Sequence, residues 1–578
     1  MNKWVLGLLL FSITAFGGVL LKYDDDENLY APKVLEYVMT DIRDQVAVTE
    51  VTVMFSMSEY DTTFAQLQFP LPASANIIRA EEFLDGVWIA CSLVAVVDSS
   101  DSGIGTGGVS GGADVNEYLG ERPFVLELVA STPEDVRVRF KYIQLLEYDK
   151  GLINYTYPSH SPDYVSESCD SFSFMCMVHS SRDIVSFDGG YAETSITGSG
   201  LIRSVVHGER DFIETEPLSL DLEVESDDIG LTAMFYKQDP DTGYFLFIVE
   251  PPMDYDTSEI IPKDFVFVID RSGSMRSDNK MINARLAAIA CIENLNPMDR
   301  FNIIPFNSSL SMFSEEMLPV TEDNRRDGVE YLDELMAGGG TNIYEAVAAG
   351  LDCFESERLA EMIFLTDGLS DRLDETREHA RAVNLELGAS IYSIGLGDDV
   401  DSVFLANLAF ENSGTYLKVE SSNIEEKVTE LFSYLNYPVL RTPELMISSI
   451  ETDEIYPRDI PALFMGKQLV ISGKYYGSGD ADIALTGIED GPVEYDFPDV
   501  HFPDYTDSLS FIPIIWAKQY IDYWIAWMRA NGEEDSLVTR VTDIALRYGI
   551  VCKYTEFYHG EEEEEEEDTT GWESDAEV

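Results

Sequence analysis

The stretch KDFVFVIDRSGSM, residues 263–275, starts as an apolar run and ends in a cluster of side-chain oxygens. Its run from Phe265 to Ile269 contains no polar residue, which is typical of a strand that is buried on both faces. Asp270 follows the run directly, and Ser272 and Ser274 come at alternate positions after it. A core strand therefore delivers one carboxylate and two hydroxyls to a single turn.

Four more apolar runs follow this strand and alternate with helical segments up to about residue 434. They are RFNIIPF (300–306), EMIFLTDG (361–368), SIYSIGLG (390–397) and GTYLKVE (414–420). Buried strands that alternate with helices indicate a parallel, doubly wound α/β sheet. Because ligands of such sheets bind at the carboxyl ends of the strands, we expect Asp270 and Asp367 to lie at a binding crevice.

Two helical segments show a regular apolar spacing. The first, residues 281–295, carries at helical intervals Ile282, Leu286, Ile289 and Leu295. The second, residues 536–549, carries one stripe made of Leu537, Val541, Ile544, Ala545 and Tyr548. We expect Ser536 to cap the start of this second helix and Gly549 to end it.

Short runs of alternating apolar and polar residues lie on both sides of the α/β region. They cover residues 34–157, 183–252 and 438–504, and this alternation indicates antiparallel strands with one face toward water. An apolar helical stretch at 511–530 follows the last of them. The Gly/Ser/Asp-rich residues 96–115 predict a flexible loop. Their formal matches to GxGxxG and GxSxG lack the strand-turn-helix context that a phosphate loop or a nucleophile elbow requires.

The chain is strongly acidic, with 107 acidic and 37 basic residues and a formal net charge of −70. Only eleven of the acidic residues lie from Glu561 onward, so the body of the chain is acidic as well as its tail. This charge argues against a nucleic-acid partner, since binding phosphates needs a basic surface. It favours cations, basic partners or simple solubility in a saline setting.

The N-terminal residues predict an export signal. Lys3 precedes an apolar run from Trp4 to Phe11, and Ala15-Phe16-Gly17 fits a small-x-small cleavage site. The alternative is an uncleaved membrane anchor, because the apolar run extends to Leu21 and so reaches membrane-spanning length.

The six cysteines are too few for a disulfide scaffold in a chain of 578 residues. Cys169 and Cys176 lie close together in a stretch that is typical of a polar loop, and they could pair after export. Four more lie in apolar surroundings and are expected to be buried thiols: Cys91, Cys291, Cys353 and Cys552.

Two more segments add oxygen ligands to the first turn. AGGGTNIYEAV, residues 337–347, places Thr341 directly after three glycines, and IFLTDG places Asp367 at the end of a strand. A set that offers only oxygens suits Mg²⁺, Ca²⁺ or Mn²⁺. The predicted metal site consists of Asp270, Ser272, Ser274, Thr341 and Asp367.

FVFVIDRSGSM, GGGTNI and IFLTDG resemble the metal-ion-dependent adhesion site (MIDAS) of von Willebrand factor type A (vWA) domains. In that family the DxSxS serines and the threonine coordinate the metal, and the acids coordinate it directly or through water. The resemblance implies these roles for the five residues, with Mg²⁺ as the favoured ion and Ca²⁺ or Mn²⁺ as alternatives. It also implies an open position on the ion that accepts an acidic group from a partner.

The flanking segments LQFPLPASANIIRAEEFLDG, VRVRFKYIQLL and NYTYPSH resemble the VIT domain of inter-alpha-trypsin inhibitor heavy chains, although the Gly/Ser-rich loop interrupts that pattern. The implied fold is multidomain, with an antiparallel β VIT domain and β-sandwich-like segments around a doubly wound, Rossmann-like α/β vWA domain. The predicted divisions are a signal peptide or anchor (1–17), the VIT domain (30–160), a β-rich spacer (180–255), the vWA domain (262–436), a β-rich segment (438–505), C-terminal helices (508–558) and a disordered acidic tail (560–578).

Together these features predict a non-enzymatic adhesion or interaction protein that is secreted or lies on the extracytoplasmic cell surface. Its expected partner is a protein or matrix ligand that offers an acidic group to the metal. One alternative is a metal-assisted hydrolase, but no His or Glu is tied by motif to the site as a general base. The other is an intracellular VIT/vWA scaffold, against which the export-like N-terminus stands.

Overall fold

The structure is a computed structural model of the chain. It describes residues 19–23, 30–57, 64–72, 74–95, 123–129, 135–149, 151–158, 168–213, 217–225, 229–251, 262–277, 279–355, 358–367, 372–397, 400–412, 414, 416–419, 438–458, 460–464, 468–488 and 491–558. The predicted export signal, the Gly/Ser-rich loop and the acidic tail lie outside these residues and stay predictions.

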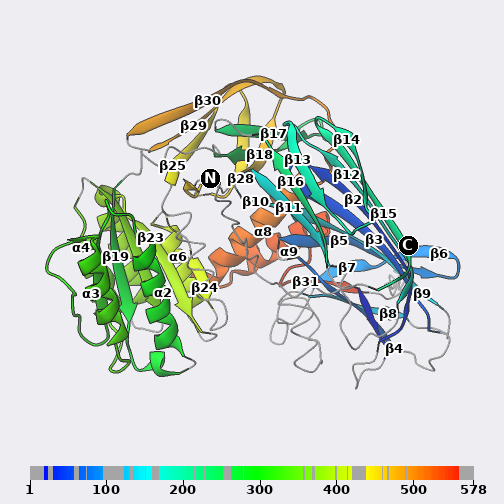
Figure 1. Cartoon of the computed structure of the whole chain (residues 1–578). Helices are drawn as coiled ribbons and strands as arrows, with labels where there is room; N and C mark the ends of the chain where they lie inside the picture. The colour runs from blue at the N-terminus through cyan, green and yellow to red at the C-terminus, as the bar shows by residue number, and fades with distance from the viewer. Residues whose placement is uncertain are drawn as a thin grey trace, which may run out of the picture.

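A six-stranded sheet forms the centre of an α/β domain (Figure 1). Its spatial order is β21-β20-β19-β22-β23-β24, and every neighbouring pair is parallel except β20 with β21. The strands are β19 (Lys263–Asp270), β20 (Arg300–Phe306), β21 (Leu318–Pro319), β22 (Leu359–Thr366), β23 (Ser390–Leu396) and β24 (Tyr416–Val419). The doubly wound α/β fold predicted from the sequence is confirmed.

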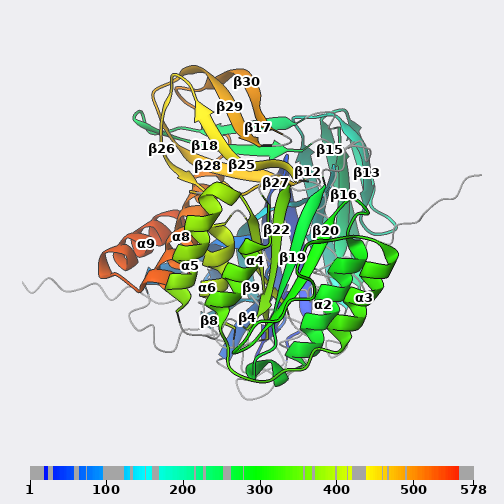
Figure 2. The same ribbon diagram turned by 90° about the vertical axis from the view of Figure 1, so that its left-hand side faces the viewer.

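Helices cover both faces of this sheet (Figure 2). One face carries α2 (Lys280–Asn294) and α3 (Glu322–Asp333), and the other carries α4 (Ile343–Asp352), α5 (Leu373–Leu387) and α6 (Ser402–Phe410). Alternate side chains of β19 pack into the apolar cores on the two faces of the sheet. Phe265, Phe267 and Ile269 pack on the α2 side, whereas Val266 and Val268 pack on the α4 side. All eight residues of β19 are buried, as expected for a central parallel strand.

Helix α2 turns two of its large apolar residues away from the sheet. Ile282 and Leu286 are each 46% exposed, so the predicted stripe is wrong at these two positions. The buried face is formed mainly by smaller side chains, among them Ala284, Ala287, Ala288 and Cys291. Small residues prevail there because the spacing between packed elements is set by the side chains at their contact, and alanines let the helix lie close to the strands.

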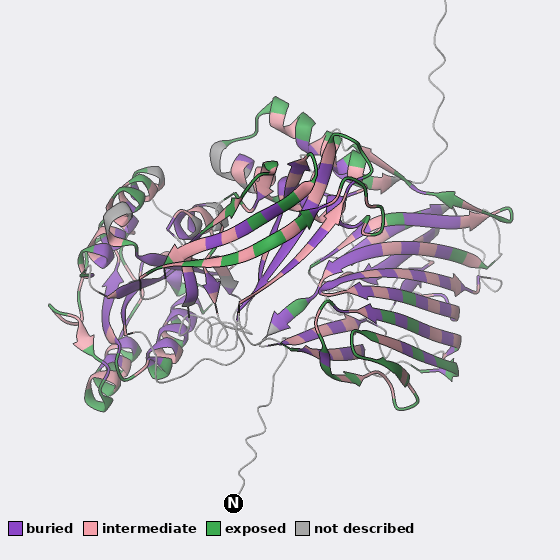
Figure 3. Ribbon diagram, turned by 90° about the horizontal axis from the view of Figure 1, so that it is seen from above, coloured by how far each residue is buried: buried purple, intermediate pink, exposed green. Residues whose placement is uncertain are grey.

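The N-terminal half folds as a β-sandwich (Figure 1). An eight-stranded sheet, β14-β15-β12-β2-β3-β9-β5-β6, shares one core with the sheets β1-β4-β8 and β10-β11-β16-β13. The strands are β1 (Leu20–Lys22), β2 (Lys33–Arg43), β3 (Val46–Phe55), β4 (Phe64–Pro70), β5 (Ala75–Leu84), β6 (Val87–Ala90), β8 (Pro123–Val129), β9 (Val136–Leu145), β10 (Glu147–Asp149), β11 (Leu152–Tyr157), β12 (Cys169–His179), β13 (Ile184–Gly189), β14 (Ser195–Ser199), β15 (Ile202–Phe212) and β16 (Leu218–Val224). Figure 3 shows the resulting alternation of buried and less buried residues along the strands of the large sheet.

Strand β12 lies in the middle of the eight-stranded sheet, parallel to β2 and antiparallel to β15. It lies between the predicted VIT domain and the predicted spacer, and it joins β2 of the former to β15 of the latter. The sandwich therefore continues without a break in its core to Val224, whereas the family boundaries themselves stay predictions.

A second β region packs two four-stranded sheets around another core. One sheet has the order β17-β18-β28-β26, and the other has the order β27-β25-β29-β30. The strands are β17 (Gly230–Tyr236), β18 (Thr242–Glu250), β25 (Pro438–Ile447), β26 (Glu451–Tyr456), β27 (Leu463–Phe464), β28 (Leu469–Tyr476), β29 (Gly479–Ile488) and β30 (Pro492–Phe502). Because β18 pairs with β28, the α/β domain is inserted in sequence between two adjacent strands of one sheet.

Two helices, α8 (Ile512–Asn531) and α9 (Asp535–Tyr548), follow these strands. The predicted stripe of α9 is confirmed, since Val541 and Ala545 are buried and the other members pack beside them. Gly549 ends the helix at a φ of +69°. The predicted cap is wrong, because Glu534 holds that position and Ser536 lies inside the first turn. None of the helices in the described ranges joins enough length to enough apolar character for a membrane crossing.

The interpretation of Cys169 and Cys176 as loop residues that could pair is wrong. Both residues lie in β12, not in a loop, and both are buried free thiols. Seven steps along an extended strand separate their Cα atoms by about 23 Å, whereas a disulfide tolerates at most about 7 Å. Of the other four, three are buried as expected, and Cys353 is partly exposed.

Candidate metal centre

The predicted metal site lies at the carboxyl edge of the parallel sheet. The chain runs from β19 to β20 on one side, and β22 lies on the other side of β19, so this is a topological switch point. Asp270 is the last residue of β19, and Asp367 follows β22 directly. Because neighbouring parallel strands end at the same edge, the two carboxylates share the crevice where doubly wound sheets bind ligands.

The turn after β19 is organised around the buried Asp270 carboxylate. The backbone N–H of Ser272 donates to Asp270 Oδ1 at 2.7 Å, and the hydroxyl of Thr366 donates to Oδ2 at 2.6 Å. The Oγ atoms of Ser272 and Ser274 lie 2.9 Å apart. The turn therefore presents two hydroxyls side by side, next to a carboxylate that its own strand and β22 hold in place.

The glycine-rich turn at 338–340 packs against the turn after β19. The N–H of Gly273 donates to the carbonyl of Gly339 at 3.0 Å. Gly339 has a φ of +98°, and a Cβ there would come within 2.9 Å of Asn307 Nδ2, so this position requires glycine. Thr341 is half-buried and lies two residues before α4 begins. The backbone hydrogen bond between Gly273 and Gly339 thus brings the segment that contains Thr341 close to the two serines.

Sequence reasoning missed two residues of this crevice, Lys280 and Thr366. Lys280 is 1% exposed, and its Nζ lies 3.4 Å from Oδ2 of the fully buried Asp367. Lys280 is the first residue of α2 and stands one turn before Ala284 on the buried small-residue face. That stripe of alanines was the available signal that the lysine would be buried.

The electrostatics of the crevice favour an added cation. Burial is the main cause that raises the pKa of the Asp270 carboxyl to about 6, and the charge of Asp367 adds to it. The hydrogen bonds from Thr366 and Ser272 act in the opposite direction. Two buried carboxylates beside one ammonium leave an excess of negative charge, which attracts a divalent cation.

The donor set fits a hard divalent cation. It offers carboxylate and hydroxyl oxygens, which Mg²⁺, Ca²⁺ and Mn²⁺ prefer. Among the residues that the structure describes, no three His, Cys, Asp or Glu side chains gather in one place, as a zinc site of nitrogen and thiolate ligands would need. The five residues predicted from the sequence thus come from three segments that meet at one strand edge, while their role as ligands stays a prediction.

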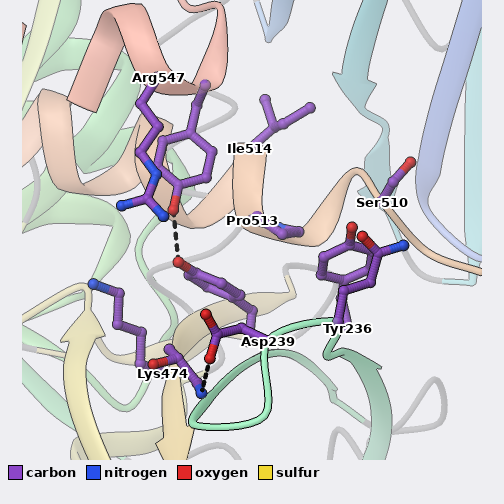
Figure 4. Close-up of a pocket in the computed structure, with 11 residues that line it drawn as sticks. Tyr236, Asp239, Lys474, Ser510, Pro513, Ile514 and Arg547 are labelled. Atoms are coloured by element: carbon purple, nitrogen blue, oxygen red, sulfur yellow. Dashed lines mark hydrogen bonds between the residues drawn. The ribbon is translucent and has the colours of Figure 1, made fainter. Parts of the chain in front are cut away.

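Two clefts elsewhere in the chain are separate from this crevice. One encloses about 430 Å³ between the β17–β18 hairpin, β28, α8 and α9 (Figure 4). Arg547 and Lys474 lie on one side of it and Tyr236 on the other, and the hydroxyls of Tyr244 and Tyr548 lie 2.6 Å apart. None of the five predicted ligands lines either cleft.

The family model for the von Willebrand factor type A domain matches residues 264–432. The match contains all five predicted ligands and the parallel strands described above. Residues 264–432 are a von Willebrand factor type A domain. The resemblance drawn from the DxSxS, GGGTNI and IFLTDG motifs is confirmed at the level of the domain.

Curated relatives of the chain include inter-alpha-trypsin inhibitor heavy chains, the family that the flanking segments resemble. Human heavy chain H4 is 25% identical over 346 residues, which cover 54% of this chain and 36% of that protein. Human heavy chain H2 is 26% identical over 247 residues, which cover 40% of this chain and 26% of that protein. The chain thus spans about a quarter to a third of the length of these curated relatives.

Solved structures are also similar to parts of the chain. A von Willebrand factor type A protein from Catenulispora acidiphila has a TM-score of 0.40 at 14% identity, covering 56% of this chain and 88% of that one. Proximal thread matrix protein 1 from the mussel byssus, with a zinc-occupied MIDAS motif, has a TM-score of 0.25 at 21% identity. That match covers 30% of this chain and 46% of the mussel protein.

Proposed function

We propose that this chain is a non-enzymatic interaction protein that binds its partner through a divalent cation held in its vWA domain. The observation that carries the proposal is the meeting of three oxygen-bearing segments at one end of the parallel sheet. Thr366 links β22 to Asp270 at 2.6 Å, and Gly273 links the serine turn to Gly339 at 3.0 Å. No segment offers enough ligands alone, but together they offer five.

The proposed roles divide the ligands by type. The hydroxyls of Ser272, Ser274 and Thr341 coordinate the ion, and Asp270 and Asp367 hold it directly or through water. Mg²⁺ is the favoured ion, with Ca²⁺ and Mn²⁺ as alternatives. A bound ion with few charged ligands supplies an electropositive open position for a carboxylate of the partner.

The proposed partner is a protein or matrix ligand with an exposed acidic group. We propose that the chain binds this partner outside the cytoplasm, either as a secreted protein or at the cell surface. The alternative is attachment to the membrane through an uncleaved N-terminal anchor. The similarity to inter-alpha-trypsin inhibitor heavy chains and the export-like N-terminal sequence support this location.

Metal binding is tested first, by calorimetric titration of the full chain with MgCl₂, MnCl₂ and CaCl₂. Asp270→Ala should lower the affinity at least about 100-fold, because loss of a residue that merely supports a ligand already costs about 10- to 100-fold. Glu355→Gln is the matched control, since Glu355 is an exposed acid of the same domain and its loss changes the net charge equally. Unchanged metal binding by Asp270→Ala would show that the metal does not bind at the proposed site.

Partner binding is tested next, with immobilised wild-type chain, Asp270→Ala and Glu355→Gln. A partner that is retained in Mg²⁺, released by EDTA and absent from Asp270→Ala supports a cation-dependent interaction. Capture that ignores EDTA contradicts it. Metal-dependent hydrolysis of esters or phosphates by the wild type that is lost in Asp270→Ala would contradict the non-enzymatic function. It would support the alternative of a metal-assisted hydrolase.

A further inference from the structure

The candidate metal centre already contains a cation of its own, the Lys280 ammonium. Its Nζ lies 3.4 Å from Asp367 Oδ2, and both side chains are buried. Removing an ammonium from water costs free energy, and a buried ammonium is therefore found only where a carboxylate compensates its charge. Lys280 is therefore a part of the site's charge balance and not a surface lysine that happens to lie near it.

The charges of the crevice can be counted from these contacts. In the part of the chain that the structure describes, these contacts join two acids, Asp270 and Asp367, and one base, Lys280, which pairs with Asp367. Both oxygens of Asp270 accept hydrogen bonds from neutral groups, Ser272 N–H and the Thr366 hydroxyl. In the absence of a metal ion, the positive charge of Lys280 therefore neutralises one of the two negative charges that would attract a divalent cation.

We propose that Lys280 is an internal counter-ion that lowers the affinity of this vWA domain for its divalent cation and stabilises the domain when the cation is absent. The proposal rests on the metal site of the proposed function and names how that site is regulated. A cation held at Asp367 meets the repulsion of the nearby ammonium. In a buried crevice this repulsion is only weakly screened, so it opposes binding strongly.

The two effects of Lys280 have opposite signs, and this separates a counter-ion from a lysine that only packs. Removing the charge takes the Lys280 ammonium away from the two buried carboxylates, so the metal-free protein loses stability. The same change removes the repulsion of the incoming ion, so metal affinity rises. A lysine that only fills space would lower stability with or without metal and would not raise the affinity.

The test compares the full-length wild type with Lys280→Met, using calorimetric titration with MgCl₂ and MnCl₂ and thermal unfolding in EDTA and in excess Mg²⁺. Lys280→Met should bind Mg²⁺ at least about tenfold more tightly, since removal of one nearby buried charge commonly changes an affinity by more than that. Its unfolding temperature in EDTA should fall, and the rise caused by Mg²⁺ should be larger than in the wild type. Lys280→Gln, which keeps a hydrogen-bond donor without the charge, carries the same expectation where methionine is not tolerated.

Lys263→Met is the matched control, because Lys263 is equally buried and lies at the opposite end of β19. It should lower the unfolding temperature and leave the Mg²⁺ affinity unchanged. Equal or weaker Mg²⁺ binding by both Lys280 variants overturns the counter-ion role, and the proposed function survives if the wild type still binds. A wild type that binds no metal, beside Lys280 variants that do, overturns the proposed function and leaves the counter-ion role standing. Absence of metal binding from the wild type and both variants overturns both.

Discussion

Glu250, the last residue of β18, is a carboxylate buried where the sandwich meets the second β region. Its Oε1 accepts hydrogen bonds from Arg182 at 2.6 Å and from Gln45 at 2.8 Å. Within the described residues its Oε2 has no hydrogen-bond partner. Burial raises the pKa of Glu250 to about 7, and the charge of Arg182 only partly offsets this.

This raised pKa makes stability depend on pH with a defined sign. Between about pH 4.5 and 7 the folded chain keeps a proton on Glu250 that the unfolded chain releases, so stability falls as the pH rises through this window and levels off above it. Glu250→Gln should remove at most about 3 kcal/mol of that fall. Urea unfolding of both proteins at pH 4.5, 6 and 8 measures the difference, and parallel curves would contradict the assignment.

Helix α8 is held by one tryptophan that contacts several elements. Trp516 is fully buried. The centre of its ring lies 5.3 Å from the ring centre of Tyr244 in β18 and 5.8 Å from that of Tyr548 in α9. Its indole N–H donates to the carbonyl of Glu454 at 3.0 Å, and Lys474 Nζ lies 4.1 Å from its ring centre. A single side chain thus joins α8 to both α9 and the second β region.

Trp516→Ala should lower the free energy of unfolding by about 3–5 kcal/mol, because it opens a cavity at the meeting point of these elements. Trp516→Phe serves as its control. Phenylalanine keeps most of the ring packing but loses the hydrogen bond to Glu454, so its cost should be clearly smaller. Guanidinium unfolding measures both, and equal costs would mean that the hydrogen bond, not the packing, holds the helix.

On the scale of the whole molecule, three bodies each have a core of their own (Figure 1). A further buried cluster joins Val46 of the sandwich to Leu246 of the second β region and to Ile512 of α8. Helix α8 contacts α6 of the vWA domain as well as β18 and β28. Strand β31 (Thr555–Tyr558) pairs with β7 (Ser92–Ala95), so the chain returns to its N-terminal half. The whole chain carries a net charge of −70, most of it outside the acidic tail, and this charge acts against the close approach of the three bodies.

Salt should therefore stabilise the full chain. We expect the unfolding temperature to rise by several degrees between 20 and 500 mM NaCl, because the screening length falls from about 20 Å to a few Å over this range. EDTA in every sample excludes an effect of divalent ions, and KCl at equal ionic strength should give the same rise. A flat or falling unfolding temperature would show that self-repulsion does not limit stability.

Local pattern was sufficient to predict much of the fold and the candidate site. The uninterrupted apolar run before Asp270 predicted a central strand, and three short motifs predicted which segments meet at its end. Local pattern failed where a contact depends on another element. Ile282 and Leu286 have helical spacing, but the sheet accepts the alanine face of α2 instead. Cys169 and Cys176 look like loop neighbours until β2 and β15 hold them in one extended strand.

The sequence by itself determined the parallel α/β domain, the flanking strands and the five oxygen-bearing residues, because burial periodicity and strand-end motifs are written in consecutive residues. Only the tertiary structure decided that β12 enters the first sandwich and that β18 pairs with β28 across the whole inserted domain. It alone placed Lys280 beside Asp367. Pairings over tens or hundreds of residues leave no periodic trace in the chain, since they are selected by the fit between surfaces that form only on folding.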